Sequence, residues 1–246
     1  MLYIVRHPSR LDADFWQQAI PALDTARQEH TLRWRAPRDR NLSALGYLLL
    51  RLALLREYGW REMPHLLYDQ RGKPCLSKGL PHFSLSYCPQ AVVCALDSLP
   101  VGVDVAEPVA FHAMLHHALL AKIYSAEEIA VIQRARAQAQ TACILWAAKE
   151  SLCKYTGEGL PRDLPQVLCR ALPALALHGS LARLPLARMA GKAPNAAPAG
   201  ISTLRLDGIS FVQPALEIVL CRRLRHTVAA PLCHEVSPEQ LSQLFF

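Results

Sequence analysis

The hydrophobic positions between about residues 38 and 58 follow a helical period. Leucines recur there at spacings of three and four residues, which places them on one face of a helix. The stripe consists of Leu42, Leu45, Leu49, Leu52 and Leu55. Gly59 follows, and glycine commonly ends a helix because it adopts the left-handed backbone conformation without strain. The pattern predicts a long helix that ends at Gly59.

Between Pro81 and Pro108 the pattern changes to that of short strands. Residues 83–87 alternate, residues 91–96 form a continuous apolar run, and residues 101–105 follow a turn at Asp97-Ser98. Short strands separated by tight turns are typical of an antiparallel meander. We therefore expect these segments to be consecutive strands of one sheet.

Helical patterns return after Phe111. Ser125 and Glu128 form a capping box that opens a helix over residues 126–139, and a further helix over 141–155 ends near Gly157 and Gly159. Near the C-terminus, residues 201–206, 209–212 and 216–221 read as strands, with a hairpin turn at Asp207-Gly208. This order of elements predicts an α+β fold of two comparable halves, divided as residues 1–108 and 109–246.

Composition narrows the classes of protein that fit. Apolar residues make up 52% of the 246 residues, which excludes a disordered chain. The 27 Lys and Arg residues exceed the 20 Asp and Glu residues, so the net charge of +7 favours an anionic partner: nucleic acid, a nucleotide or an acidic protein. No stretch approaches the ~20 apolar residues that span a bilayer, and the first residues read as a strand. We expect a cytoplasmic protein that does not enter a membrane.

A carboxylate stands at the end of the strand predicted over residues 101–105. Asp104 lies between Val103 and Val105, and Glu107 follows three residues later. A buried aspartate is unfavourable unless it is paired or binds a cation, although an aspartate at a strand end also caps turns. Both interpretations fit this segment taken alone.

A second candidate segment lies on the helix predicted over residues 141–155. Trp146, Glu150 and Lys154 recur every four residues and share one face. Such an acid and base pair is usually a weak surface ion pair. The tryptophan indicates that this face packs partly inward, where a functional site also explains the pair.

Two further segments are candidates for ligand binding. Gly72-Lys73-Pro74 fixes a turn whose backbone can approach a flat ligand, and the same residues also fit an ordinary loop. A basic segment around Trp34 is either a solvated helix start or a phosphate-binding cluster. Its cations are Arg33, Arg35, Arg38 and Arg40.

In this order and spacing, the segments resemble the 4′-phosphopantetheinyl transferases, in particular the larger, pseudo-dimeric class that activates carrier proteins. That family shows G-K-P, F-N/S-I/L-S-H, G-I/V-D-I/V-E and W-x-x-K-E-S/A-x-x-K, followed by a glycine-rich exit. The matching residues span about 30 to 160 of this chain. They are Gly72-Lys73-Pro74, Phe83-Ser84-Leu85-Ser86, Gly102-Val103-Asp104-Val105, Trp146-x-x-Lys149-Glu150-Ser151-x-x-Lys154 and Gly157-x-Gly159-Leu160.

The resemblance implies an activity and a fold. Enzymes of this family move 4′-phosphopantetheine from coenzyme A to a serine of an acyl or peptidyl carrier protein, with Mg²⁺, and release 3′,5′-ADP. It also implies two similar α/β subdomains in a pseudo-twofold arrangement, with antiparallel strands packed on helices. Since one chain then holds both halves of the site, we expect a monomer.

The resemblance also assigns roles to residues. Asp104 and Glu150 would ligate Mg²⁺, one from each half of the chain, and Glu150 would also accept the serine proton, directly or through a bound water. Lys154 would contact the diphosphate. The coenzyme would further contact Gly72, Lys73 and Pro74 at its adenine, and Ser86 and Tyr87 at its 3′-phosphate. Arg35, Arg38 or Arg40 would contact its remaining phosphate oxygens.

The chain departs from the family pattern at two positions. Ala106 stands where the family places a second metal-binding carboxylate; either Glu107 swings into that place or water replaces it, and we favour water. This departure predicts a raised Mg²⁺ requirement. Tyr87 stands where the family has histidine, so it donates a hydrogen bond to phosphate without adding positive charge.

These departures motivate a rival reading, a degenerate member that binds coenzyme A or a carrier protein without efficient transfer. A nucleic-acid-binding protein is the other rival. The basic residues are scattered along the sequence and no RNA-binding or helix-turn-helix motif is evident, so we do not expect nucleic acid as a partner.

Overall fold

The structure is a computed structural model that describes residues 1–116, 118–161, 163–166, 182–186, 206–213, 216–223 and 233–245. Its contacts divide the chain into two compact units, Met1–Ser98 with Pro231–Phe246, and Leu99–Ala230. Among the described helices, none has the length and hydropathy to cross a membrane. Helices and mostly antiparallel sheets occur in both units, which confirms the α+β class.

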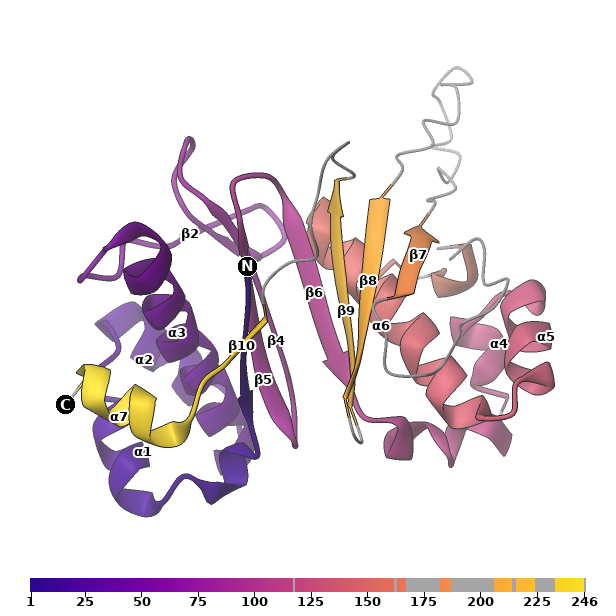
Figure 1. Cartoon of the computed structure of the whole chain (residues 1–246), viewed down its shortest axis with the longest axis horizontal. Coiled ribbons are helices and arrows are strands. Elements are labelled where there is room, and N and C mark those ends of the chain that lie inside the picture. The colour runs from indigo at the N-terminus through magenta and orange to yellow at the C-terminus, as the bar shows by residue number, and fades with distance from the viewer. Residues whose placement is uncertain are drawn as a thin grey trace. The chain divides into compact units, whose positions relative to one another are not determined.

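The first unit packs helices on one sheet (Figure 1). Its strands lie in the order β10-β1-β5-β4, and only β1 and β10 run parallel. A separate hairpin joins β2 to β3. The strands are β1 (Leu2–Arg6), β2 (Leu67–Tyr68), β3 (Pro74–Cys75), β4 (His82–Cys88), β5 (Ala91–Asp97) and β10 (Cys233–Glu235), and the helices are η1 (Pro8–Arg10), α1 (Ala13–Ala19), α2 (Thr25–Leu32), α3 (Pro37–Tyr58) and α7 (Pro238–Phe245).

The central helix of this unit is α3, as the leucine stripe predicts. Pro37 occupies its first turn, where proline is tolerated, and Gly59 ends it with a φ of 70°. Its leucines are buried on more than one side, because α3 contacts β1, β4 and β5 as well as α1, α2 and α7. This helix therefore forms the core of the first unit.

The second unit packs a long helix, α6, along its own sheet (Figure 1). The strands lie in the order β6-β9-β8-β7 and pair antiparallel. These strands are β6 (Val101–Ala106), β7 (Ala182–Leu186), β8 (Leu206–Gln213) and β9 (Leu216–Arg223). The helices are η2 (Pro108–Phe111), η3 (Met114–His116), α4 (Leu120–Ile123), α5 (Ala126–Arg134), α6 (Gln138–Thr156) and η4 (Leu164–Gln166). Thus α6 carries the candidate residues of its motif along β6 and β9.

The expected meander is wrong in its third strand. β4 and β5 form an antiparallel hairpin, but β6 pairs with β9 and belongs to the other sheet. Sequence patterns show where strands form but not which distant strand completes the pairing. The contact-based units accordingly divide at Ser98 rather than at residue 108, and the C-terminal segment joins the first unit.

The expected turn at Asp207-Gly208 is also wrong, since both residues lie inside β8. Gly208 pairs with Leu184 on one side and with Cys221 on the other. A glycine within a strand is tolerated when neighbouring strands supply the pairing on both sides. Of the strand expected over residues 201–206, residues 201–205 lie outside the described residues.

Candidate functional site

Close packing of β6 against α6 brings the two main motifs together. Gly102 lies two residues before Asp104 on β6, and a Cβ at this position would overlap the carbonyl oxygen of Ser151 and the amide nitrogen of Tyr155. Both atoms belong to the backbone of α6 and cannot move aside as a side chain can. The glycine of the Gly102-Val103-Asp104 motif thus allows a close strand–helix contact.

Asp104 and Lys154 form an ion pair across this contact. Asp104 is 5% exposed, and its Oδ1 accepts a hydrogen bond from Nζ of Lys154 at 2.7 Å. The ammonium group offsets the cost of burying the carboxylate. The structure therefore brings together an aspartate and a lysine 50 positions apart in the sequence.

Glu150 lies one helical turn before Lys154 and is half-buried. Burial raises the pKa of Glu150, the negative charge of Asp104 raises it further, and the positive charge of Lys154 lowers it. Asp104 and Glu150 are therefore close enough to interact electrostatically. Two neighbouring carboxylates beside a lysine provide oxygen ligands, a proton acceptor and a cation in one place.

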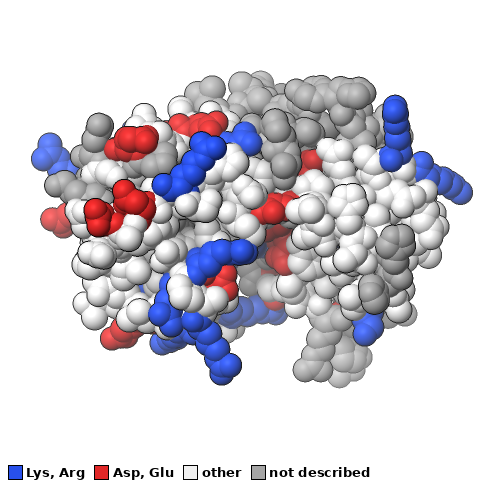
Figure 2. Space-filling model, turned by 90° about the horizontal axis from the view of Figure 1, so that it is seen from below, with Lys and Arg blue, Asp and Glu red and all other residues white. Residues whose placement is uncertain are grey.

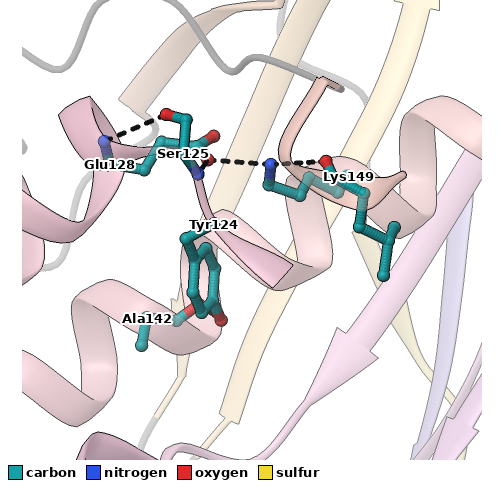
Figure 3. A network of polar contacts seen from close by, with 6 residues as sticks. Tyr124, Ser125, Glu128, Ala142 and Lys149 are labelled. Atoms are coloured by element: carbon teal, nitrogen blue, oxygen red, sulfur yellow. Dashed lines mark hydrogen bonds and ion pairs between the residues drawn. The ribbon is translucent and has the colours of Figure 1, made fainter. Parts of the chain in front are cut away.

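Lys149, the other lysine of the motif, has a structural environment (Figure 3). Its side chain is fully buried, and Nζ lies 2.8 Å from Oε2 of Glu128 and donates a hydrogen bond of 3.1 Å to the carbonyl of Leu164. Glu128 also accepts from the backbone of Ser125, which completes the capping box of α5. This network holds α5, α6 and η4 together and fixes the helix that carries Glu150.

Glu217 is a buried carboxylate that the sequence analysis did not single out. It is 1% exposed at the start of β9, where Nε2 of Gln140 donates a hydrogen bond of 2.7 Å to its Oε1. Its Oε2 has no hydrogen-bond partner among the described residues. Burial raises the pKa of Glu217 from 4.5 to about 7, although the Gln140 hydrogen bond lowers it. No motif marks this residue; only strand pairing reveals it.

This raised pKa predicts that Glu217 makes stability depend on pH. The unfolded state loses the proton near pH 4.5 and the folded state near 7, so stability falls as pH rises between these values and levels off above. Relative to the parent, Glu217→Gln should gain about 3 kcal/mol of stability between pH 4.5 and pH 8, because only the parent loses stability over this range. Urea unfolding in EDTA checks this, with exposed Glu127→Gln as the control. Equal effects of Glu217→Gln at both pH values would contradict it.

In the first unit, Gly72 and Lys73 lie in the turn between β2 and β3, and Pro74 is the first residue of β3. Gly72 has a φ of 83°, a conformation that favours glycine. Asp69 shapes the turn, because its Oδ1 accepts hydrogen bonds from the backbone N–H groups of Arg71 and Lys73. Asp69 is a further residue that the motif did not indicate, although aspartate before a glycine turn is a recognisable signal.

Only some of the predicted phosphate-contact residues of the first unit lie close to one another. Tyr87 packs against Trp34, with ring centroids 6.5 Å apart, so β4 lies beside the segment that carries Arg35. Burial raises the pKa of Tyr87, which keeps its hydroxyl a donor. Ser86 is buried and, as the preceding strand residue, faces the opposite side of the sheet. Arg35 and Arg38 are exposed, whereas Arg40 donates to the backbone carbonyls of residues 34 and 35.

A buried arginine lies at a pocket next to this hairpin. Arg27 is 2% exposed, and its guanidinium lies over the rings of Tyr47 at 4.3 Å and Tyr68 at 4.7 Å. Its Nη1 has no hydrogen-bond partner among the described residues. A pocket of about 250 Å³ is lined by Arg27 and Tyr68 together with Asp24 and His65. The first unit therefore contains a buried cation at a pocket, which sequence reasoning missed.

The candidate residues thus fall into two groups. Asp104, Glu150 and Lys154 meet in the second unit, so the two expected metal ligands do not come from different halves of the chain. Apart from Lys154, the coenzyme-contact candidates belong to the first unit. Among the described residues, no three His, Cys, Asp or Glu side chains form a group ready to ligate a metal ion. The close pair Asp104 and Glu150 nevertheless fits Mg²⁺, which takes few protein carboxylates and keeps several waters.

Known proteins resemble this chain over both units. The sequence model of the 4′-phosphopantetheinyl transferase superfamily matches residues 100–187. The 4′-phosphopantetheinyl transferase Sfp of Bacillus subtilis (strain 168) is 29% identical over 145 residues, which cover 56% of this chain and 62% of that protein. The 4′-phosphopantetheinyl transferase psf-1 of Bacillus pumilus is 28% identical over 216 residues, covering 84% of this chain and 82% of that protein.

The matched family segment contains Asp104, Lys149, Glu150 and Lys154, the residues that the fold of the second unit brings around α6. Fold, site and comparisons thus define a mixed α/β protein with a paired-carboxylate site. Over residues 100–187 the chain is similar to the 4′-phosphopantetheinyl transferase superfamily, and its curated relatives carry the same name.

Proposed function

We propose that this protein transfers 4′-phosphopantetheine from coenzyme A to a serine of an acyl or peptidyl carrier protein, with Mg²⁺, and releases 3′,5′-ADP. The observation that carries the proposal is the juxtaposition of buried Asp104 on β6 with half-buried Glu150 and Lys154 on α6. Similarity to the superfamily over residues 100–187 supports the same reaction class.

The residues of the second unit supply what this reaction needs. The serine oxygen forms a bond to the phosphorus of the phosphopantetheine group, the bond from that phosphorus to the oxygen of 3′,5′-ADP breaks, and the serine proton must leave. Glu150 is suited to accept that proton, since burial and the charge of Asp104 raise its pKa. Lys154 places positive charge where the diphosphate becomes more negative.

Asp104 and Glu150 would hold the divalent cation. Mg²⁺, when bound, would neutralise charge on the diphosphate and make the ADP oxygen a better leaving group. In the described arrangement Asp104 is paired with Lys154, so Lys154 must share or exchange this carboxylate when the cation binds. The Lys154 side chain is 28% exposed, so its ammonium group can turn towards a phosphate while its stem stays packed.

We place the nucleotide end of coenzyme A on the first unit. The Gly72-Lys73-Pro74 turn offers backbone to a flat ring, and the neighbouring Arg27 offers a buried guanidinium group at a pocket of about 250 Å³. Tyr87 adds a neutral hydroxyl donor. The 3′-phosphate would depend on arginines at least as much as on Tyr87, because tyrosine adds no positive charge.

The proposed protein partner is an acidic carrier protein. The net charge of +7 favours association with such a partner. Figure 2 shows Lys and Arg side chains alternating with Asp and Glu on the surface of the first unit, at the left of the view. This mixed pattern fits local contacts with a small protein and a coenzyme better than a continuous polyanion. We further propose that the protein acts as a monomer in the cytoplasm.

Intact-mass spectrometry of an apo acyl carrier protein tests the proposal directly. Incubation with the enzyme, coenzyme A and Mg²⁺ should add one phosphopantetheine mass, and omission of coenzyme A should abolish the gain. A carrier variant whose acceptor serine is alanine is the matched control. Unmodified carrier proteins of the fatty-acid, polyketide and nonribosomal-peptide types would overturn the proposal.

A second candidate function is binding without efficient transfer. Ala106 and Tyr87 favour it, since they remove a carboxylate and a cationic side chain that the family pattern contains. Tight coenzyme A binding by calorimetry together with absence of any mass gain would establish this alternative, and Ala106→Glu with Tyr87→His would then restore transfer.

A further inference from the structure

The turn proposed to bind coenzyme A belongs to a hairpin that has little structure of its own. β2 and β3 contain two residues each and form a separate two-stranded sheet. An isolated hairpin of this size is at best marginally stable in water. Leu66 and Leu76, which flank the two strands, are buried in the core of the first unit and anchor the base of the hairpin. The strands beyond this base need a further contact to hold the turn in one place.

Tyr68 of β2 makes such a contact. The guanidinium group of Arg27 lies over its ring, with 4.7 Å between the guanidinium carbon and the ring centroid. The same guanidinium carbon lies 4.3 Å from the ring centroid of Tyr47 on α3. Arg27, which belongs to α2, therefore links the hairpin to both α2 and α3.

The environment of Arg27 suits this link. Arg27 is 2% exposed, and a guanidinium group is planar, weakly hydrated and able to stack on aromatic faces. A desolvated cation gains more from the negative face of a ring than an exposed one does. The ring of His30 also stacks on Tyr68, with centroids 6.3 Å apart and an interplanar angle of 21°. Burial and the positive charges of Arg27 and Arg33 lower the pKa of His30, so its ring is neutral at pH 7 and does not repel Arg27.

The pairing within the hairpin relates the position of Tyr68 to that of the turn. Tyr68 is the Cα partner of Pro74, the residue that follows the turn. The next residue, Asp69, accepts a hydrogen bond of 2.8 Å from the backbone N–H of Lys73. A shift of Tyr68 therefore moves both the strand residue after the turn and the carboxylate that shapes the turn.

Apolar packing gives Tyr68 little support. Tyr68 is 44% exposed, and a pocket of about 250 Å³ lies beside it. The pocket is lined by Asp24, Ala26 and Arg27 at the start of α2 and by residues 65–68. Segments with few buried apolar contacts open at low free-energy cost unless a specific contact holds them. The contact with Arg27 is therefore expected to decide where the ring of Tyr68 lies.

We propose that Arg27 is a positioning residue of the coenzyme site, because its guanidinium group fixes Tyr68 and thereby holds the Gly72-Lys73 turn in the arrangement that receives the nucleotide. The inference rests on the proposed function, since that function places the nucleotide end of coenzyme A at this turn. Arg27 acts here through Tyr68, and the effect requires no contact between Arg27 and the ligand. Loss of the guanidinium group then weakens coenzyme A binding and leaves the cation site of the second unit intact.

Coenzyme A binding, measured by calorimetry, tests this inference without relying on transfer. Arg27→Met keeps the approximate length of the side chain and removes its charge, so we expect about tenfold weaker binding, or about 1.4 kcal/mol. Mn²⁺, as a substitute for Mg²⁺, is titrated into the same variant and free Mn²⁺ is followed by electron paramagnetic resonance. The Mn²⁺ affinity should equal that of the parent, because Asp104 and Glu150 belong to the second unit. Arg10→Met removes an exposed arginine from the first unit and should change neither affinity.

Variants of Tyr68 separate this role from direct contact of Arg27 with the ligand. Tyr68→Phe keeps the ring and should bind coenzyme A within about twofold of the parent, whereas Tyr68→Leu should bind about tenfold more weakly. Because Tyr68 is 44% exposed, these variants should stay folded even if Arg27→Met does not. Since both residues act through one contact, Arg27→Met combined with Tyr68→Leu should lose no more than about twofold beyond either single variant.

Hydrogen–deuterium exchange of the unliganded protein reports directly on the turn. The N–H of Lys73, bonded to Asp69, exchanges when the turn opens. Peptides covering residues 66–76 should exchange about tenfold faster in Arg27→Met and in Tyr68→Leu, and at the parental rate in Tyr68→Phe. Parental coenzyme A affinity and exchange in Arg27→Met, fully additive losses in the double variant, an equal loss in Arg10→Met, or absence of coenzyme A binding by the parent would each overturn the inference.

Transfer assays distinguish this inference from the proposed function. If the parent modifies a carrier protein and Arg27→Met leaves the KM for coenzyme A unchanged, only the inference fails; the expected result is a KM about tenfold higher with kcat within about twofold of the parent. If no carrier protein is modified while coenzyme A affinities and exchange rates follow the expected order, the positioning role of Arg27 stands and the proposed transfer fails.

Discussion

Glu150→Gln is expected to lower the rate of carrier-protein modification by about 10³-fold or more. Glutamine keeps the size of the side chain but cannot accept the serine proton, and it removes one of the two proposed cation ligands. The carboxylate is half-buried beside Asp104, so no bulk water takes over its role at equal efficiency. Intact-mass spectrometry at saturating coenzyme A measures the rate.

The control for this prediction is Glu127→Gln, because Glu127 is an exposed carboxylate in the first turn of α5. Its rate should stay within about twofold of the parent, as expected for a surface substitution. Urea unfolding of both variants tests whether they remain folded. A Glu150→Gln protein that is folded and transfers at the parental rate would show that another group takes the proton.

Local sequence patterns identified where the helices and strands form better than which strands pair with each other. The leucines of α3 and the glycine after them locate that helix closely, and Ser125 with Glu128 locates the start of α5, since these signals act within a few residues. The pairing of β6 with β9 joins residues more than 100 positions apart. No pattern within either strand specifies that register. The pairing nevertheless decides which strands belong to which unit.

The same limit applies to the site. The motif around Asp104 and the motif around Glu150 were visible in the sequence, but the ion pair of Asp104 with Lys154 was not predicted. Glu217 belongs to no motif, and only the ladder between β6 and β9 reveals it. Lys149 is the opposite example, a residue that belongs to a motif but has a structural contact. It lies next to Glu150 in the sequence and is buried in an ion pair with Glu128.

Gly102→Ala is expected to destabilise the protein by about 3 kcal/mol or more. Overpacking usually costs about 1–3 kcal/mol, and the cost is highest where the neighbouring atoms belong to the backbone and cannot move aside. The new Cβ would overlap backbone atoms of Ser151 and Tyr155 and lie 3.0 Å from Cα of Tyr155. These atoms lie in the ordered part of α6, so β6 must move instead. Urea unfolding of the purified variant measures the loss.

Gly46→Ala is the matched control, since it adds the same methyl group to a buried glycine. A Cβ at Gly46 would lie 3.7 Å from Cδ1 of Leu85, an ordinary contact with a side chain, and alanine favours the helix by about 1 kcal/mol. This variant should be as stable as the parent or more so. If both variants had the same urea midpoint of unfolding as the parent, the result would contradict the close packing of β6 against α6.

The effect of Gly102→Ala on activity follows from the same contact. Movement of β6 away from α6 separates Asp104 from Lys154 and Glu150, which lie on the other side of the interface. Any folded fraction of the variant should therefore bind Mn²⁺ more weakly than the parent, although no carboxylate has been removed. Normal Mn²⁺ affinity in the folded variant would mean that the carboxylates do not depend on this packing, and the small residue at 102 would then serve the fold alone.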